Sequence, residues 1–248
     1  MKCFPPVRRL LGAIFLVALT GLRAYSAGNP PPPPPLNDVT AGQSLAAELR
    51  ALRPMEGAEF TGTLKIRRPS HPTIFIPLTS KIVPGEKSWQ VIYQTGGTNL
   101  VPAEKLIVTH FTNQPNEYLF ARTNAPQPVP PGQLFTPLAG SDFSFADLGL
   151  EFFHWPHQML VQKEMRKGRA CRVLESRPAV TNAYARVVSW IDNETSGLLM
   201  AEAYDKNNVR VKQFEVNSVA QNQVRKMEML DLKVDGRTWI EFDPPKER

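Results

Sequence analysis

Short strand patterns joined by tight turns fill the second half of the chain, and this feature constrains the fold most. The pattern is clearest over residues 183–192, where side chains alternate between two faces. Lys167-Gly168 and Asp235-Gly236 are typical of β-hairpin turns. The expected strands span residues 158–165, 169–176, 183–192, 198–205, 209–216, 223–234 and 238–242. Connections this short join antiparallel neighbours, because parallel strands need a long crossover between them.

The first half of the chain continues the same pattern with more interruptions. Strands are expected at residues 59–68, 73–83, 88–94, 106–111 and 117–121. In the third of these, Trp89, Val91 and Tyr93 share one face. Five prolines lie between residues 124 and 137, so we expect a loop without regular structure there.

Two segments carry helical patterns. In residues 39–52, Leu45, Leu49 and Leu52 recur at helical spacing, with Thr40 or Asp38 as the N-cap. This helix is expected to dock on the apolar surface of the strands.

The second helical pattern lies in residues 140–155, Gly-Ser-Asp-Phe-Ser-Phe-Ala-Asp-Leu-Gly-Leu-Glu-Phe-Phe-His-Trp. Ser144 and Asp147 form a capping box, and Pro156 ends the helix. One face would carry Phe145, Leu148 and Phe152, widened by Leu150 and Phe153. We therefore predict a single α+β domain, a large curved antiparallel sheet or open barrel with helices on its concave face.

The first residues are typical of a cleaved signal peptide. A basic start with Lys2, Arg8 and Arg9 precedes an apolar stretch over 10–19, which is too short to span a bilayer comfortably. Small residues at the positions that a signal peptidase reads, Ala24 and Ser26, favour cleavage after Ser26 or one residue to either side, with an uncleaved membrane anchor as the alternative. The domains expected are a signal peptide over 1–26, an extended proline-rich linker over 27–37 and a folded domain over 38–248.

Removal of the leader changes the charge balance. It takes four basic residues and no acidic ones, so 25 of 29 basic residues remain against 23 acidic ones, and the net charge falls from +6 to +2. This weakens any nucleic-acid interpretation. Cys171 then remains as a lone cysteine and is expected to be buried in a strand.

Motifs for catalysis or metal binding are scarce. His154 and His157 are separated by Pro156, which breaks the helix that would align two ligands. Asp142 is interpreted as a turn or cap residue and Asp147 as the reciprocal cap, in preference to an acid pair. The sequence offers no Gly-x-Ser-x-Gly elbow and no phosphate-binding glycine loop. We therefore predict a binding protein that is not an enzyme, with no catalytic residue, no metal and no cofactor.

Apolar aromatic and methionine side chains on the strands favour a ligand cavity, although a plain hydrophobic core would look the same. Unfilled apolar volume accepts acyl chains at about 0.8 kcal/mol per buried methylene. The candidate cavity residues are Trp89, Val91, Tyr93, Phe145, Leu148, Phe152, Val188, Trp190, Met227 and Met229.

Four segments, together with their order and spacing along the chain, are similar to those of a known family. They are residues 140–148, 169–176 (Arg-Ala-Cys-Arg-Val-Leu-Glu-Ser), 184–192 (Tyr-Ala-Arg-Val-Val-Ser-Trp-Ile-Asp) and 203–205 (Ala-Tyr-Asp). Together they resemble the outer-membrane lipoprotein-sorting protein family, the LolA-like proteins, from about residue 45 to the C-terminus. The resemblance implies an incomplete β-barrel of about eleven strands, covered by helices around a hydrophobic cavity.

In LolA itself this cavity carries the acyl chains of lipoproteins across the periplasm, and the fold also serves acceptor and sensor proteins. The favoured hypothesis is a monomeric periplasmic protein that shelters lipid or lipoprotein acyl chains for outer-membrane lipoprotein sorting. The alternative is a non-enzymatic periplasmic sensor or scaffold that binds an inner- or outer-membrane protein partner. An envelope enzyme is the third hypothesis.

Overall fold

Alternating burial along the strands directs one row of side chains into the interior of a curved sheet. In β2 (Ile74–Val83), Ile76, Leu78 and Ser80 are buried, whereas Phe75 and Pro77 on either side of Ile76 are exposed. This computed structural model describes residues 36–122, 125–181, 183–220 and 223–244. The signal peptide and almost all of the proposed linker therefore lie outside the described residues.

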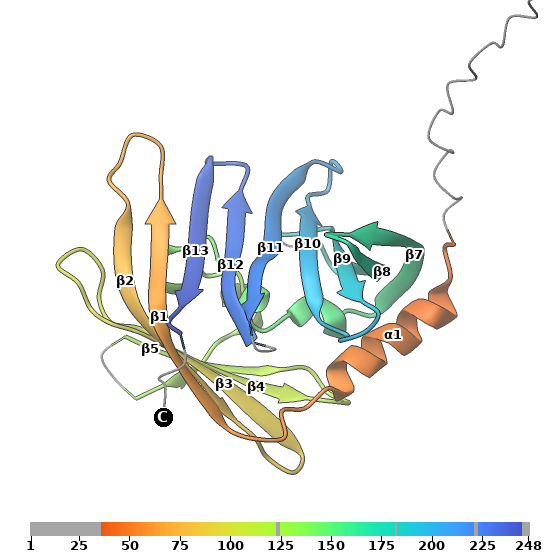
Figure 1. The fold of residues 1–248 in the computed structure, drawn as a ribbon, viewed down its shortest axis with the longest axis horizontal. Coiled ribbons are helices and arrows are strands. Elements are labelled where there is room, and N and C mark those ends of the chain that lie inside the picture. Colours follow the sequence, from red (N-terminus) through yellow and green to blue (C-terminus); the bar gives the residue numbers. More distant parts are fainter. Residues whose placement is uncertain (1–35, 123–124, 182, 221–222, 245–248) are drawn as a thin grey trace, which may run out of the picture. The chain divides into compact units, whose positions relative to one another are not determined.

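The strands of the described residues form one antiparallel sheet of 13 strands (Figure 1). They are β1 (Ala58–Arg67), β2, β3 (Ser88–Thr95), β4 (Lys105–Phe111), β5 (Glu117–Ala121), β6 (Gln127–Pro128), β7 (His157–Arg166), β8 (Arg169–Arg177), β9 (Arg186–Asp192), β10 (Leu198–Tyr204), β11 (Arg210–Ala220), β12 (Gln223–Asp231) and β13 (Gly236–Phe242). The predicted large curved sheet is confirmed, with more strands than the resemblance implied.

The order of the strands explains where the helices lie. The sheet runs β6-β5-β4-β3-β2-β1-β13-β12-β11-β10-β9-β8-β7, so all neighbours are consecutive except β1 and β13. Strands β6 and β7 are the two edges, and residues 129–156 connect them. Because this connection must travel from one edge to the other, it crosses the concave face and carries the central helices with it (Figure 1).

The helical elements are short except for the first. They are α1 (Val39–Ala51), α2 (Phe145–Leu148) and the 3-10 helices η1 (Pro131–Gln133), η2 (Leu138–Gly140) and η3 (Glu151–His154). Asp38 caps α1 by accepting a hydrogen bond from the Ala41 amide at 2.8 Å, so Thr40 is not the cap. No helix in the described part of the chain has the length and apolarity needed to cross a membrane.

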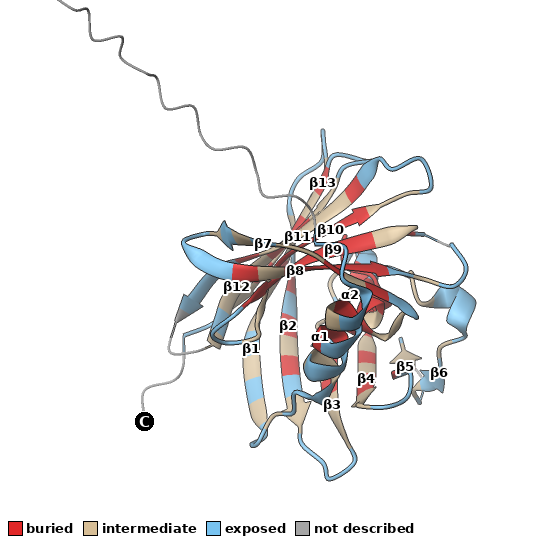
Figure 2. Cartoon of the chain, turned by 90° about the vertical axis from the view of Figure 1, so that its right-hand side faces the viewer, coloured by how far each residue is buried: buried red, intermediate tan, exposed pale blue. Residues whose placement is uncertain are grey.

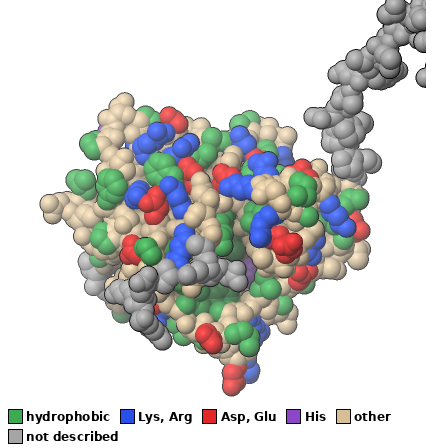
Figure 3. All heavy atoms as spheres, in the orientation of Figure 1, with side chains coloured by type: hydrophobic (Ala, Val, Ile, Leu, Met, Phe, Trp, Pro, Cys, Tyr) green, Lys and Arg blue, Asp and Glu red, His purple; other side chains and the backbone are tan. Residues whose placement is uncertain are grey.

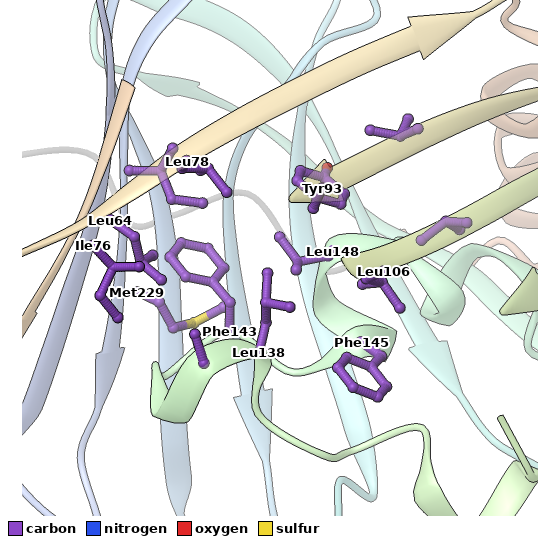
Figure 4. Close-up of a cluster of buried hydrophobic side chains, with 14 of the residues drawn as sticks. Leu64, Ile76, Leu78, Tyr93, Leu106, Leu138, Phe143, Phe145, Leu148 and Met229 are labelled. Carbon is purple, nitrogen blue, oxygen red and sulfur yellow. The ribbon is translucent and has the colours of Figure 1, made fainter. Parts of the chain in front are cut away.

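Two apolar clusters lie between the sheet and the helices. Buried residues are found on the strands and on the helices that cover them (Figure 2). The first packs Phe143 and Leu138 of the connection against Leu64, Ile76 and Met229 of the sheet (Figure 4). The second joins α1 and η3 to strands β7–β11, and its members include Leu45, Ala46, Phe152, Phe153, Leu160, Leu174, Val187 and Ile191.

A third cluster lies on the opposite face of the sheet. It contains Cys171, Val173, Val188, Trp190 and Met200. Cys171 is 1% exposed in β8, which confirms that it is buried in a strand. Because side chains alternate along β9, the positions of Val188 and Trp190 point away from the face that the helices cover.

The central helix differs from its prediction. The capping box of Ser144 and Asp147 is confirmed, but the helix ends at Leu148 instead of continuing to Trp155. Leu150 adopts a left-handed conformation, with φ 50°, and the 3-10 helix η3 starts after it. Phe145 and Leu148 consequently pack in the first cluster and Phe152 in the second, not along one face.

Two turns also refine the sequence interpretation. The hairpin at Lys167-Gly168 is confirmed, and both residues have positive φ. The last hairpin turns over residues 232–235, because Gly236 already pairs with Asp231 as the first residue of β13. The described part of 124–137 contains only β6 and η1 as regular structure.

Candidate functional site

The central segment, residues 138–155, is fastened to the sheet by three acidic side chains. Asp142 accepts hydrogen bonds from Thr238 Oγ1 at 2.7 Å and from Arg68 at 2.9 Å. Asp142 is therefore an anchor to β13, not a turn or cap residue as the sequence suggested. Glu151 accepts a hydrogen bond of 2.8 Å from the Tyr118 hydroxyl of β5.

The third anchor is Asp147, which serves the capping box and the sheet at once. It accepts hydrogen bonds from the Ser144 amide at 2.9 Å and the Ser144 hydroxyl at 2.7 Å. The Tyr184 hydroxyl donates to it at 3.1 Å, and Lys212 of β11 pairs with it at 3.2 Å. The cap of α2 is thus also its attachment to β11.

The central segment leaves two hollows inside the curve of the sheet. A cavity of about 20 Å³ lies on the β9–β12 side, where Tyr184, Phe214 and Met229 contribute to its wall. A larger cavity of about 160 Å³ lies on the β3–β4 side, and we call it the β3 cavity. Leu150 lines both, so the left-handed residue sits in the partition between them.

The β3 cavity is mostly apolar. It is lined by Leu49, Arg50, Leu52, Trp89, Val91, Tyr93, His110, Phe111, Leu148, Gly149, Leu150, Phe153 and His154. In the orientation of Figure 1, apolar side chains form the floor of a recess in the molecular surface (Figure 3). The volume is below the roughly 300–1,000 Å³ of pockets that enclose small-molecule ligands.

The ten candidate cavity residues are distributed over several environments. Trp89, Val91, Tyr93 and Leu148 line the β3 cavity, and Phe152 and Met229 line the smaller one. Phe145 is buried in the first apolar cluster and Met227 packs against it, and neither lines either of these two cavities. Val188 and Trp190 belong to the cluster on the other face and are separated from both cavities.

One end of the β3 cavity is polar. His110 stacks on Trp89 with ring centroids 4.2 Å apart, and His154 lies beyond it in η3. Burial lowers the pKa of His110 to about 4, with a further contribution from His154. Burial also lowers the pKa of His154 to about 4, helped by the neighbouring Arg50. Both imidazoles are therefore neutral at pH 7.

Sequence reasoning missed Arg50 and His154 as cavity residues. Arg50 lies four residues after the buried Ala46, so it falls on the apolar face of α1, and this spacing was the available signal. Its guanidinium donates to the carbonyl oxygens of Phe153 at 2.7 Å and Thr112 at 3.3 Å. These two bonds connect α1 to η3 and to the end of β4.

Metal ligands do not gather at the cavity. Among the described residues no group of three or more His, Cys, Asp and Glu side chains is placed to hold a metal ion. The arrangement of apolar walls with a few polar groups at one end is the usual form of a binding pocket.

Solved structures of three proteins share this fold. A DUF1329 family protein from Desulfovibrio piger has a TM-score of 0.68 at 19% identity, and a proposed outer membrane lipoprotein-sorting protein domain from Vibrio parahaemolyticus has 0.68 at 16%. A LolA superfamily protein from Nitrosomonas europaea has 0.56 at 15% identity. Each alignment covers 84% of this chain and 92% of the other. At these identities the likeness concerns the fold.

The chain thus has the LolA-like fold, and the resemblance inferred from its sequence is confirmed at that level. No curated protein matches the chain in sequence. Residues 111–246, more than half of the chain, match the model of a family described as "uncharacterized protein", and the chain belongs to this family.

Proposed function

We propose that the protein is exported to the periplasm by a signal peptide over residues 1–26 and there binds acyl chains of lipids or lipoproteins without catalysing a reaction. Residues 27–37 would act as a spacer before the folded domain over 38–248. The support is the LolA-like fold, which this chain shares with the lipoprotein-sorting domain named above, together with the helices that cover its own apolar concave face.

The observation that carries the proposal is the β3 cavity. Its walls present Trp89, Tyr93 and Leu148 to one unfilled volume of about 160 Å³. Each methylene buried there would contribute about 0.8 kcal/mol. The volume accepts only part of a long acyl chain, so a whole chain requires residues 148–154 to move away from β3.

A direct test compares the amount of lipid that co-purifies with the wild type and with each of two matched variants. Val91 points into the cavity, whereas its neighbour Ile92 lies on the other face of β3. The Val91→Phe variant should fill the cavity, and the Ile92→Phe variant should leave it open. Protein purified without detergent is extracted and analysed by mass spectrometry.

The proposal expects stoichiometric lipid from the wild type and from Ile92→Phe, with a loss of about tenfold or more in Val91→Phe. Circular dichroism of both variants checks that the fold is intact. A lipid-free wild type, or equal lipid in both folded variants, would contradict the proposal.

An exposed apolar patch favours binding of a membrane-protein partner as a second candidate function. Phe75 is 58% exposed and Leu100 is 77% exposed, and both line a surface hollow beside the end of β1 and the start of β2. Exposed apolar patches mark interaction sites in many proteins. A partner recovered stoichiometrically with the wild type and with Val91→Phe, but lost in Phe75→Ser, would support this function over lipid carriage.

A further inference from the structure

Arg50 is a partly buried cation without a carboxylate partner among the described residues. Its two hydrogen bonds go to the neutral carbonyl oxygens of Phe153 and Thr112. Burial lowers the pKa of Arg50, and no carboxylate offsets this effect. Many other cations of the described chain pair with acids, for example Arg172 with Glu48 at 2.8 Å.

The guanidinium also retains free donors. Arginine carries five N–H groups, and Arg50 uses its Nε and Nη1 atoms for the two carbonyl bonds. The Nη2 atom donates to no acceptor in the described residues. A guanidinium fork of this kind matches the oxygen geometry of a carboxylate or phosphate.

Arg50 lies between the apolar β3 cavity and a polar hollow. It lines the β3 cavity together with His154, and the same two residues line a second hollow of about 380 Å³. The other walls of that hollow are Gln43, Asn113, Gln114, Pro115, Trp155, Pro156 and Gln158. None of its described walls is acidic, so an anion would meet amide groups and the guanidinium without repulsion from these walls.

We propose that the ligand of this site is an amphiphile with an anionic head group, whose tail enters the β3 cavity and whose head binds Arg50 in the adjoining polar hollow. This inference rests on the proposed function and specifies the class of ligand. The chemistry shared by the candidate heads is an oxyanion, either the carboxylate of a fatty acid or the phosphate of a phospholipid.

The test measures binding of matched pairs by calorimetry, with each amphiphile below its critical micelle concentration or its solubility limit. Palmitate is compared with hexadecanol, and lysophosphatidic acid with the monoacylglycerol of the same acyl chain. The first pair differs by a carboxylate and the second by a phosphate, so each pair isolates one oxyanion. The wild type should bind the anionic member of at least one pair about tenfold more tightly, because a hydrogen bond to a charged group is worth more than a neutral one.

Variants assign this preference to one side chain. Arg50→Gln should lose about tenfold in affinity for the anionic member while its affinity for the neutral member stays unchanged, and Arg50→Lys should recover part of the loss. Arg53→Gln is the matched control, because Arg53 is an exposed cation just beyond the same helix and lines neither hollow, so both affinities should stay as in the wild type.

Three results would overturn the inference. Equal binding of both members of each pair by the wild type would show tail binding without head selection, which spares the proposed function. Equal losses of affinity in Arg50→Gln and Arg53→Gln would show that the preference for the anionic member comes from the net charge of the protein and not from Arg50. Absence of binding by all four amphiphiles would overturn the inference and the proposed function together.

Discussion

The pair of Asp147 and Lys212 gives a stringent test of how the central segment is held. Both side chains are largely buried, at 10% and 16% exposure, and their charged atoms lie 3.2 Å apart. In an Asp147→Asn variant, Lys212 keeps only the carbonyl of Asp142, at 2.7 Å. The ammonium would then be a buried charge without a counter-ion.

The magnitude follows from the contacts that change. Removing one partner of a buried pair costs about 3–5 kcal/mol, and weakening the cap of a helix adds roughly 0.5–2 kcal/mol. Because an asparagine still accepts from Ser144, we expect a loss near the lower end, about 3 kcal/mol. For a domain of this size that corresponds to a decrease in Tm of about 6–12 °C.

A double-mutant cycle separates the pair from its surroundings. Lys212→Met alone should cost less, about 1–2 kcal/mol, because Asp147 keeps its bonds to Ser144 and Tyr184. The double variant should be more stable than the sum of single losses predicts, with a coupling of about 1–3 kcal/mol. Urea unfolding followed by circular dichroism measures all four proteins. Additive losses, or a cost below about 1 kcal/mol for Asp147→Asn, would refute the anchoring role.

Two further predictions concern α1 and the histidines. Gly42→Ala should destabilise the protein by about 1–3 kcal/mol in urea unfolding, although alanine favours helices, because its Cβ would lie 2.5 Å from the Met159 backbone. Ser44→Ala on the exposed side of α1 is the control. A Gly42→Ala variant that is more stable than the wild type would contradict the close packing of α1 on β7. His110 has a folded pKa of about 4 against 6.5 in the unfolded chain, so the unfolded chain binds more protons between these values and stability should rise with pH across that window. This contribution to the free energy of unfolding, at most about 3 kcal/mol, is complete above pH 6.5 and is lost as the pH falls towards 4. In His110→Gln the free energy of unfolding should depend less on pH across this window, and an unchanged slope would contradict the prediction.

Local patterns were sufficient to predict most of the strands and the capping box. The strand Glu117–Ala121 has the bounds expected from the sequence. Strand β11 runs beyond its expected end at Val216, because pairing with β12 continues through two register shifts where the side chains are polar. Propensity alone could not show this continuation, since it depends on the partner strand.

Contacts between distant residues account for what the sequence could not predict. The central helix breaks next to Gly149, where a Cβ would lie 2.1 Å from the Tyr118 hydroxyl, and this close approach joins residues far apart in the chain. Asp142 resembled a turn residue because its partners, Arg68 and Thr238, are 74 and 96 positions away. The sequence did not show on which face of the sheet Trp190 lies. An alternating pattern does not fix the register of β9, and a shift of one residue moves every side chain to the other face.

The strand order also explains why a cavity forms beside β3. Residues 129–156 must cross from β6 to β7, and Asp142 and Asp147 tie the crossing to β13 and β11. On that side the hollow is about 20 Å³, whereas on the β3 side it is about 160 Å³. There the crossing is held by Glu151 to Tyr118 and by Arg50 to the Phe153 carbonyl. An anion bound to the free Nη2 of Arg50 would lie beside this second bond, so the head group would bind next to the segment that must move to widen the β3 cavity.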